Sequence, residues 1–343
     1  MASLRDVARL ANVSLATASR ALNSDSRVNP STRLLVWKAS QKLGYSISKL
    51  RNLSCIQKSV LILIRGLQGS EHTTSSSGLS DFPRHVTCGV QSIMETCQIT
   101  THIERTSFSA NKAEFQIEPG LVGILIASGI KNPKFIENLK ELGLPFVVVG
   151  SYIVPHVGDS VMADVNHGTQ ILVKHLVEQG CRKIGFINGP PDSPTSEEKY
   201  NGMRLFLALN DLPFDPSLII SGEFDAESGF SSTKKLLASH PDIDGLLYGD
   251  DRQAIGGMKE IKEQGRRIPE DMAVASFGNY EYSKRLIPSL TSVSYDMNAM
   301  GRIAAQRLLM LVEQPYDIPW QITVPTELIV RESSRRMIDL KIT

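Results

Sequence analysis

The stretch VSLATASRALN, residues 13 to 23, places three hydroxyl side chains and one arginine within one short segment of helical character. Hydroxyl and guanidinium groups hydrogen-bond to phosphate oxygens, and arginine also reaches base edges. The two positions near the start of the segment are Leu15 and Ala16, which lack such groups. Apolar side chains in the major groove can contact the methyl group of thymine. The stretch therefore predicts a helix that reads DNA partly through apolar contacts.

Two further helices are predicted to hold this stretch in place. Ser3 and Asp6 fit a capping box, and Asn12 stands where a tight turn tolerates a left-handed backbone. Ser14 can then cap the second helix, and Asn29 followed by proline begins a third helix with a buried stripe that ends at a glycine. This pattern indicates a helix-turn-helix module, with a generic three-helix bundle as the alternative. In the stripe we expect Leu34, Leu35, Ala39 and Leu43 to be buried.

The charge of the chain is distributed unevenly. Residues 1–58 contain ten lysines or arginines against two aspartates, although the chain of 343 residues has a formal net charge of only +1. A basic N-terminal segment on a mildly acidic body favours a polyanionic partner for that segment. A merely solvated basic face would explain the charge equally well if it stood alone.

Several motifs together resemble the LacI/GalR family of bacterial transcription regulators. The N-terminal motifs are LRDVARLANVSLATASRALN, VNPSTR and KLGY, and later segments are VEQGCRKIGFINGP, DDRQAIGGMKEIKEQGRRIPEDMAVASFGN, IPSLTSVSYDMNAMGRIAAQRLL and PTELIVRESS. The resemblance implies an all-α helix-turn-helix head over residues 1–46, a hinge linker over residues 47–58, and an α/β core over residues 59–340. That core is expected to be periplasmic-binding-protein-like, with two lobes and chain crossovers near residues 158, 289 and 316.

The resemblance also assigns residues of the head to DNA. Leu15 and Ala16 would start the recognition helix in the major groove, while Arg20 and Asn23 would reach bases or phosphate nearby. Arg20 is alternatively an ordinary surface arginine. Hydroxyls, amides and helix N-termini bind phosphates and so position the module on DNA. The residues expected to make these phosphate contacts are Ser14, Thr17, Ser19, Asn29 and Thr32.

The linker departs from the family pattern. Ile47 replaces the usual proline, Leu50 stands where alanine is usual, and Arg51 and Leu53 come one residue early. In the family this hinge helix inserts a leucine into the minor groove and kinks the site. Leu53 is the candidate wedge, with Leu50 second, and a shifted register would weaken kinking. Alternatively, both leucines pack the linker against the body.

From residue 59 onward, short apolar runs rich in β-branched residues alternate with helical stretches. Such alternation predicts parallel sheets covered by helices, with ligands bound beyond the carboxyl ends of the strands. The runs are SVLILI, TTHIE, LVGILIAS, PFVVVG, KIGFIN, DGLLYG, MAVASF and TSVSY.

An effector cleft between the lobes is implied by the resemblance. Lys199 stands where the family commonly has an arginine that binds the ligand with two hydrogen bonds, and Phe224 matches a ring that stacks on the ligand. Asp250 is the first residue of an Asp-Asp pair that stands where the family has Asn-Asp. Asn279 lies beside a glycine that replaces a frequent aspartate, Tyr295 matches a further wall, and Glu71 is the candidate from the polar segment after the first strand. Each of these six residues has surface or core packing as its alternative.

The charges expected in the cleft favour one class of effector. Asp250 either pairs with Lys199 or accepts hydrogen bonds from sugar hydroxyls. One cation, one carboxylate and one ring fit a neutral saccharide. A purine is less favoured, because the matched positions supply no second stacking ring.

The remaining residues point away from catalysis and cofactors. The motifs of nucleophilic hydrolases, dinucleotide binding, P-loops and zinc proteases are absent, and the four cysteines show neither zinc nor disulfide spacing. No metal or cofactor is therefore expected, and neither a signal peptide nor an apolar run of membrane-spanning length is present, so we expect a cytoplasmic protein.

The function expected from these observations is a sequence-specific DNA-binding regulator, acting as a repressor. A homodimer would bind a pseudo-palindromic operator under the control of a saccharide effector. The alternative is a soluble carbohydrate-binding or sugar-processing α/β protein with an incidental helical head.

Overall fold

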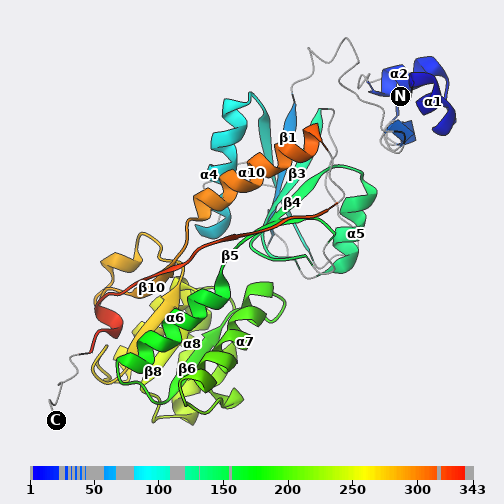
Figure 1. Ribbon diagram of the computed structural model, residues 1–343. Helices are drawn as coiled ribbons and strands as arrows, with labels where there is room; N and C mark the ends of the chain where they lie inside the picture. The colour runs from blue at the N-terminus through cyan, green and yellow to red at the C-terminus, as the bar shows by residue number, and fades with distance from the viewer. Residues whose placement is uncertain are drawn as a thin grey trace.

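A computed structural model shows a small helical head and two α/β lobes (Figure 1). The structure describes residues 3–22, 28, 29, 32, 35, 36, 39, 40, 43, 58–66, 81–108, 120–130, 132–153, 157–314 and 318–336.

The head contains helices α1, Leu4–Leu10, and α2, Leu15–Leu22. The capping box at the start of α1 forms as predicted, with the Asp6 carboxylate accepting from the backbone N–H of Ser3 at 2.9 Å. Asn12 adopts the left-handed backbone that the turn requires, at a φ of 54°. Ala18 and Leu22 are buried in a core that also contains residues of α1. The sequence thus predicted the first two helices and their turn.

The third helical segment of the head buries only part of the predicted set: Ala39 is buried and Leu43 packs partly buried against the same core, whereas Leu34 lies outside the described residues. Residues 32, 35, 36, 39 and 40 are helical. Val36 and Ala39 are buried, whereas Leu35 is 55% exposed. The prediction that Leu35 belongs to the buried stripe is therefore wrong, because the stripe passes through the neighbouring valine.

Lobe 1 is built on a six-stranded parallel sheet with the order β11-β5-β4-β3-β1-β2. Helices α4 and α10 pack on one face, and α5 packs on the other. The elements are β1 Ser59–Arg65, α4 Asp81–Thr96, β2 Thr100–Thr106, β3 Leu121–Ala127, α5 Pro133–Glu141, β4 Phe146–Val149, β5 Asp159–Ala163, α10 Met297–Glu313 and β11 Gln321–Val324.

Lobe 2 has a second six-stranded sheet with the order β12-β10-β9-β8-β6-β7, parallel except for β12. Helices α6 and α7 cover one face, and α8 and α9 cover the other. The elements are α6 Val165–Glu178, β6 Ile184–Asn188, α7 Pro194–Leu209, η4 Pro216–Leu218, β7 Ile219–Ser221, α8 Ala226–Ser239, β8 Gly245–Tyr248, α9 Asp251–Glu263, β9 Ala273–Phe277, η5 Ser283–Arg285, β10 Thr291–Ser294, β12 Glu327–Ile329 and η6 Glu332–Ser334.

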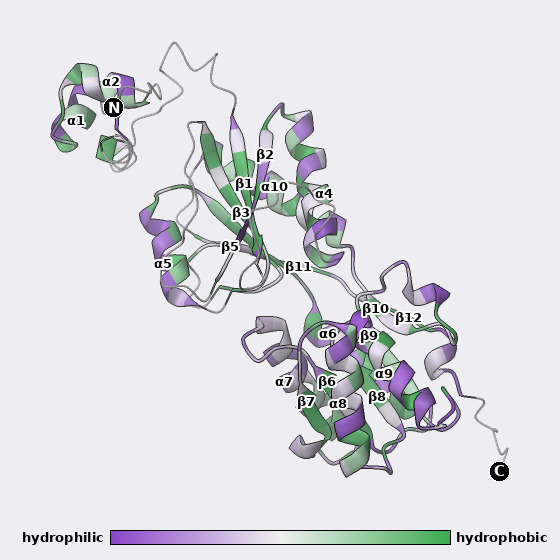
Figure 2. Ribbon diagram, turned by 180° about the vertical axis from the view of Figure 1, so that it is seen from behind, coloured by the Kyte–Doolittle hydropathy of each residue, from purple (hydrophilic) through white to green (hydrophobic). Residues whose placement is uncertain are grey.

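Apolar strands form the centre of each lobe. Figure 2 shows hydrophobic residues along the strands and hydrophilic residues along the outer helix faces. All of β4, β6, β8 and β9 is buried, as expected for parallel strands covered on both faces. The eight apolar runs of the sequence are all strands, whereas β5, β7, β11 and β12 were not predicted, because their short or polar segments show no clear apolar pattern.

The chain passes between the lobes three times, further along the sequence than expected. The crossings follow β5 at residue 164, β10 at residues 295–296 and β11 at residues 325–326. The expected positions near residues 158, 289 and 316 are therefore wrong by several residues. The physical reason is that β5, β10 and β11 pair with strands of the lobe that the chain is leaving, so each crossing has to follow the strand.

Candidate functional site

The first turn of α2 presents apolar side chains to solvent. The Ser14 hydroxyl caps this helix by accepting a hydrogen bond from the backbone N–H of Thr17 at 3.0 Å. Leu15 is 44% exposed, and Ala16 is also exposed. Because the cap fixes the start of the helix, these two side chains have a defined direction although they take no part in the core of the head.

The other residues of the described head that are predicted to contact DNA are exposed or half-buried. Arg20 is exposed in the last turn of α2, and Ser19 beside it is half-buried. Asn29 is exposed and accepts a hydrogen bond from the backbone N–H of Thr32 at 3.1 Å, as a helix cap does. Five predicted site residues lie outside the described residues, and their roles stay predictions: Asn23, Leu50, Arg51, Leu53 and Glu71.

Three of the predicted effector residues meet at the carboxyl edge of the lobe 2 sheet. Lys199 comes from α7, Phe224 precedes α8, and Asp250 follows β8 and caps α9. The Lys199 ammonium donates a hydrogen bond to the Gly249 carbonyl at 2.7 Å and lies 5.5 Å from the centre of the Phe224 ring. Residues far apart in the sequence thus form one cluster of mixed charge and aromatic character.

Lys199 is held in a nearly closed aromatic environment. Lys199 is only 6% exposed, and its ammonium lies 4.5 Å from the centre of the Phe277 ring. Burial lowers the pKa of Lys199 to about 8, although the nearby carboxylates of Asp250 and Glu198 act to raise it. The ammonium is therefore charged at neutral pH at a cost to the folded state.

The Asp250 carboxylate is hydrogen-bonded to other side chains of lobe 2. It accepts hydrogen bonds from the Arg252 side chain at 2.9 Å and from the Tyr280 hydroxyl at 3.2 Å. The sequence left open a pairing between Asp250 and Lys199, but the Lys199 ammonium donates to the Gly249 carbonyl instead. Lys199 still interacts electrostatically with Asp250, as its pKa shows.

The Phe224 ring lies directly on the backbone at the end of β6. A Cβ atom at Gly189 would stand 2.0 Å from Cζ of Phe224 and 2.6 Å from the Ser196 hydroxyl. Any larger residue at position 189 would displace the ring, so this glycine is part of the aromatic wall. Gly189 was not among the predicted site residues, although its place in an NGP segment directly after a strand is a usable signal.

Asn279 and Tyr295, the other two described effector candidates, make structural contacts in and between the lobes. The Asn279 amide donates to the Ser294 hydroxyl at 3.0 Å and accepts from the Arg331 guanidinium at 2.6 Å. Both ends of this amide are thus used within lobe 2. Tyr295 lies at the second crossing and packs against the cores of both lobes.

Asp251 was not predicted as a separate site residue, yet it forms a dense hydrogen-bond network. Its carboxylate is fully buried and accepts from the hydroxyls of Ser276, Ser283 and Ser292 and from the backbone N–H of Tyr280. Burial raises the pKa of Asp251 to about 6, while the three hydroxyl hydrogen bonds act to lower it. The adjacent carboxylates of residues 250 and 251 therefore have different sets of donors and share only Tyr280, which donates its hydroxyl to Asp250 and its backbone N–H to Asp251.

At one side of the predicted effector cleft, an exposed ion pair joins the two lobes. Arg65, at the end of β1, lies 2.8 Å from the carboxylate of Asp192, which follows β6. Close by, a Cβ at Gly129 would stand 2.9 Å from the ring of Pro194 at the start of α7. The carboxyl edges of the two sheets therefore face each other across a narrow space.

The opposite rim is formed by the start of α4 and the segment after β9. The Tyr282 hydroxyl donates to the Asp81 carboxylate at 3.4 Å, between lobe 2 and lobe 1. Phe82 lies over the end of β4, where a Cβ at Gly150 would stand 2.8 Å from its ring.

More aromatic rings lie near the cleft than the sequence suggested. The sequence prediction considered only the positions matched to the family, whereas the fold places additional rings beside Lys199 and Asp250. The additional rings near the cleft are Phe82, Phe277, Tyr280 and Tyr282.

Within the described ranges, no three histidine, cysteine or acidic side chains are grouped so as to hold a metal ion. The described helices include none with the length and apolar character of a membrane span.

Two family models match this chain. Residues 3–48 match bacterial regulatory proteins of the lacI family, and residues 173–334 match a periplasmic binding protein-like domain. The chain belongs to the lacI family of bacterial regulatory proteins. The head and the two lobes of this lacI-family protein are thus the architecture that the sequence motifs implied.

The curated relatives of this lacI-family protein are similar over nearly their full length. A ribose operon repressor from Halalkalibacterium halodurans is 26% identical over 337 residues, which is 98% of each chain. A probable HTH-type transcriptional repressor, ExuR, from Bacillus subtilis is 27% identical over 339 residues, covering 98% of this chain and 99% of the relative. Both relatives are named as repressors and not as enzymes.

Solved structures share the fold. A transcriptional regulator, CelR, in complex with cellobiose has a TM-score of 0.70 and 24% identity, covering 97% of this chain and all of that one. The lac repressor dimer bound to operator has a TM-score of 0.69 and 22% identity, covering 97% of this chain and 99% of that one.

Lys199→Met is expected to stabilise this lacI-family protein at neutral pH. The lowered pKa corresponds to a cost on the order of 3 kcal/mol for the buried charge, and loss of the hydrogen bond to Gly249 offsets part of the gain. We expect a net increase in the free energy of unfolding of about 1 kcal/mol at pH 7, measured by urea unfolding.

The pH dependence of this difference has a defined sign. Between about pH 8 and 10.5, the folded wild type loses the Lys199 proton before the unfolded chain does, so the wild type gains stability relative to the variant. The advantage of the variant should therefore shrink over that range and change sign before pH 10.5, because the wild type regains about 3 kcal/mol. Lys174→Met, at an exposed lysine of α6, is the control and should show neither effect. A less stable Lys199→Met protein at pH 7 would contradict the prediction.

Proposed function

We propose that this protein is a transcription regulator whose head binds an operator in duplex DNA, and whose binding is controlled by a saccharide held between the lobes. The observation that carries the proposal is the combination, in one chain, of a capped helix with exposed apolar residues on a basic head and a polar, aromatic cleft between two lobes. The named repressors that are similar over almost the full chain support it.

In the DNA complex, Leu15 and Ala16 contact thymine methyl groups from the first turn of α2. Arg20 reaches a base or a phosphate further along the same helix, since all three side chains are exposed. The hydroxyl and amide groups of the head hold its register on the phosphates, so they contribute affinity more than sequence preference. Such a regulator acts where bacterial DNA lies, in the cytoplasm, and it needs no catalytic group.

In the cleft, the Asp250 carboxylate accepts hydrogen bonds from saccharide hydroxyls, and the Phe224 ring stacks on the apolar face of the sugar. Lys199 supplies a point charge behind these groups. Among the similar structures, CelR is a complex with cellobiose and a regulator from Enterococcus faecium holds bound ribose, which supports this class of effector.

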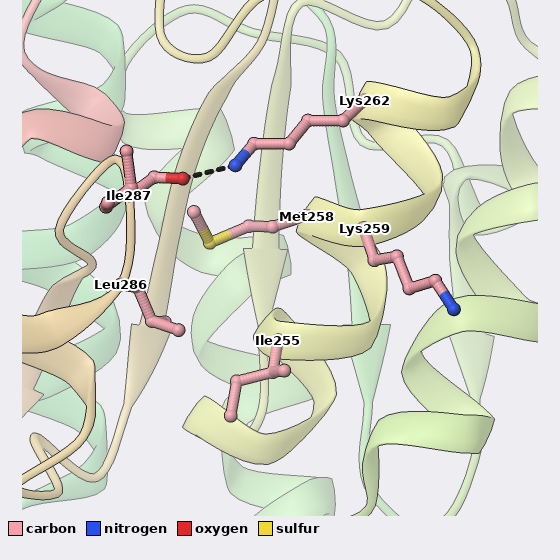
Figure 3. A pocket seen from close by; sticks show the side chains of 6 residues that line it. All are labelled: Ile255, Met258, Lys259, Lys262, Leu286 and Ile287. Atoms are coloured by element: carbon pink, nitrogen blue, oxygen red, sulfur yellow. Dashed lines mark hydrogen bonds between the residues drawn. The ribbon is translucent and has the colours of Figure 1, made fainter.

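A homodimer brings two heads to the two halves of a pseudo-palindromic operator. A groove beside α9 suits a second copy of this chain, because it is lined by Ile255, Met258, Leu286 and Ile287 and bordered by lysines (Figure 3). Ile287 is 84% exposed, more than any other large apolar side chain among the described residues. The lac repressor dimer is a structure of the same fold.

Arg20→Ala is expected to weaken operator binding by about 10- to 100-fold across all binding sequences, because a cationic contact to DNA is lost. Leu15→Gln is expected to change the preferred bases instead. Both effects can be measured by selecting bound duplexes from a random pool and titrating the selected inverted repeat in gel-shift assays at several salt concentrations.

Arg204→Ala removes the same charge from an exposed position on α7 and is the matched control, which should leave DNA binding unchanged. If the wild-type protein selects no duplex but binds a saccharide, the proposal fails and the carbohydrate-binding alternative holds.

Asp250→Ala is expected to reduce saccharide affinity by about 10- to 100-fold, because a charged hydrogen-bond acceptor is removed from the cleft. A thermal-shift screen of saccharides that includes D-ribose and cellobiose identifies the hit, and calorimetry on that hit measures the change.

The control for lost helix capping is Asn132→Ala. Asn132 caps α5 by accepting from the N–H two residues ahead, as Asp250 caps α9. Asn132→Ala should lose about 1 kcal/mol of stability, and Asp250→Ala should lose more, because Arg252 and Tyr280 also lose their acceptor. Only Asp250→Ala should lose the saccharide. Equal affinity of both variants for the hit would contradict the assignment of Asp250.

Ile287→Glu is expected to convert the dimer to a monomer at micromolar concentration in analytical ultracentrifugation, because a charge would be buried in the apolar contact. Ile318→Glu changes another exposed isoleucine, at 75% exposure, outside the groove. It should leave the dimer intact. A dimer that survives Ile287→Glu would exclude this groove as the interface.

A further inference from the structure

The segment of residues 278–283, which we call the tyrosine loop, links the effector cleft to lobe 1. At one side the Tyr280 hydroxyl donates to Asp250 at 3.2 Å, and at the other the Tyr282 hydroxyl donates to Asp81 of α4 at 3.4 Å. The two tyrosine rings lie 5.6 Å apart at an angle of 45°. One short loop therefore contacts a carboxylate of the cleft and a carboxylate of the opposite lobe.

The loop is fixed to lobe 2 by the buried carboxylate of Asp251. Two of the donors to this carboxylate come from the loop, namely the backbone N–H of Tyr280 at 2.9 Å and the Ser283 hydroxyl. The other two are hydroxyls from the sheet, Ser276 on β9 and Ser292 on β10, the latter at 2.7 Å. Asp251 thus joins the loop to the strands through a single group.

Burial makes this junction strong and selective. Asp251 has no exposed surface, and hydrogen bonds to a charged acceptor away from water stabilise more than hydrogen bonds between neutral groups. Because Asp250 is the preceding residue, any movement of the Asp251 anchor also moves the carboxylate assigned to the effector. The position of Tyr280, which contacts both aspartates, depends on the same anchor.

We propose that Asp251 is a positioning residue for effector control: by anchoring the tyrosine loop it connects the effector carboxylate of Asp250 to Asp81 of lobe 1. This role rests on the proposed function, since it takes Asp250 as an effector contact. Asp251 itself does not touch the effector. Of the three serine hydroxyls that donate to Asp251, only that of Ser283 belongs to the loop. Removing it should therefore release the loop, whereas removing a strand hydroxyl should not.

The matched test compares Ser283→Ala with Ser276→Ala in the full chain without ligand. Each substitution removes one hydroxyl from the same carboxylate, so a purely structural network loses a similar amount of stability in both. Amide hydrogen exchange is measured by mass spectrometry in peptides covering residues 278–285 and 81–90. Ser283→Ala should increase exchange about tenfold in both peptides, whereas Ser276→Ala should change neither by more than about twofold.

A third variant, Tyr282→Phe, separates the two ends of the connection. It removes only the hydroxyl that reaches Asp81, so exchange should rise in residues 81–90 while residues 278–285 stay protected. Equal exchange in the two serine variants would overturn the positioning role. Increased exchange confined to the loop in Ser283→Ala would overturn the connection to lobe 1.

These readouts use neither operator nor saccharide, so they separate this inference from the proposed function. If the exchange pattern is as expected but the wild type binds no duplex, the connection stands and the regulatory role fails. If the wild type binds an operator and a saccharide but the serine variants exchange alike, the regulatory role stands and the role of Asp251 fails.

Discussion

The three passages of the chain between the lobes are the constraint on which the site depends. The first and third passages are bonded to each other, because the backbone N–H of Asp164 donates to the Val324 carbonyl at 2.9 Å and the Thr326 hydroxyl donates to the Asp164 carbonyl at 3.2 Å. Each passage leaves the carboxyl end of a strand, and nearly all strands are parallel. The carboxyl edges of both sheets therefore face each other, which is where open α/β sheets bind ligands.

Two buried charged side chains of lobe 2, Lys199 and Asp251, lower the free energy of unfolding of the protein. Lys199 is charged among aromatic rings with its pKa lowered to about 8, and Asp251 is fully buried with its pKa raised to about 6. A protein selected for stability alone would place apolar residues at such positions. Asp251 is compensated by four hydrogen bonds, whereas Lys199 has a carbonyl and two ring faces. The less compensated charge is the one that the family resemblance assigns to the effector.

Most of the fold was predictable from local pattern. The capping box, the left-handed Asn12 and the eight apolar runs each depend on residues close in the sequence, and each appears in the structure. In the third helical segment the prediction failed for Leu35, since an apolar residue one position away fits the same helix face. The crossings were misplaced because strand pairing in lobe 1, which decides where β5 ends, is a contact between distant segments.

The sequence by itself determined the family, the two-lobe core and three residues that cluster at the carboxyl edge of the lobe 2 sheet, because those features are carried by contiguous motifs. Tertiary structure alone decided the partners of these residues: Asp250 with Arg252, Lys199 with a carbonyl, and the aromatic rings that surround them. It also decided the tyrosine loop, whose carboxylate partners, Asp250 and Asp251 in lobe 2 and Asp81 in lobe 1, lie in different lobes. The physical reason is that hydrogen-bond partners and ring contacts depend on distances of a few ångströms between segments that the chain separates by up to two hundred residues.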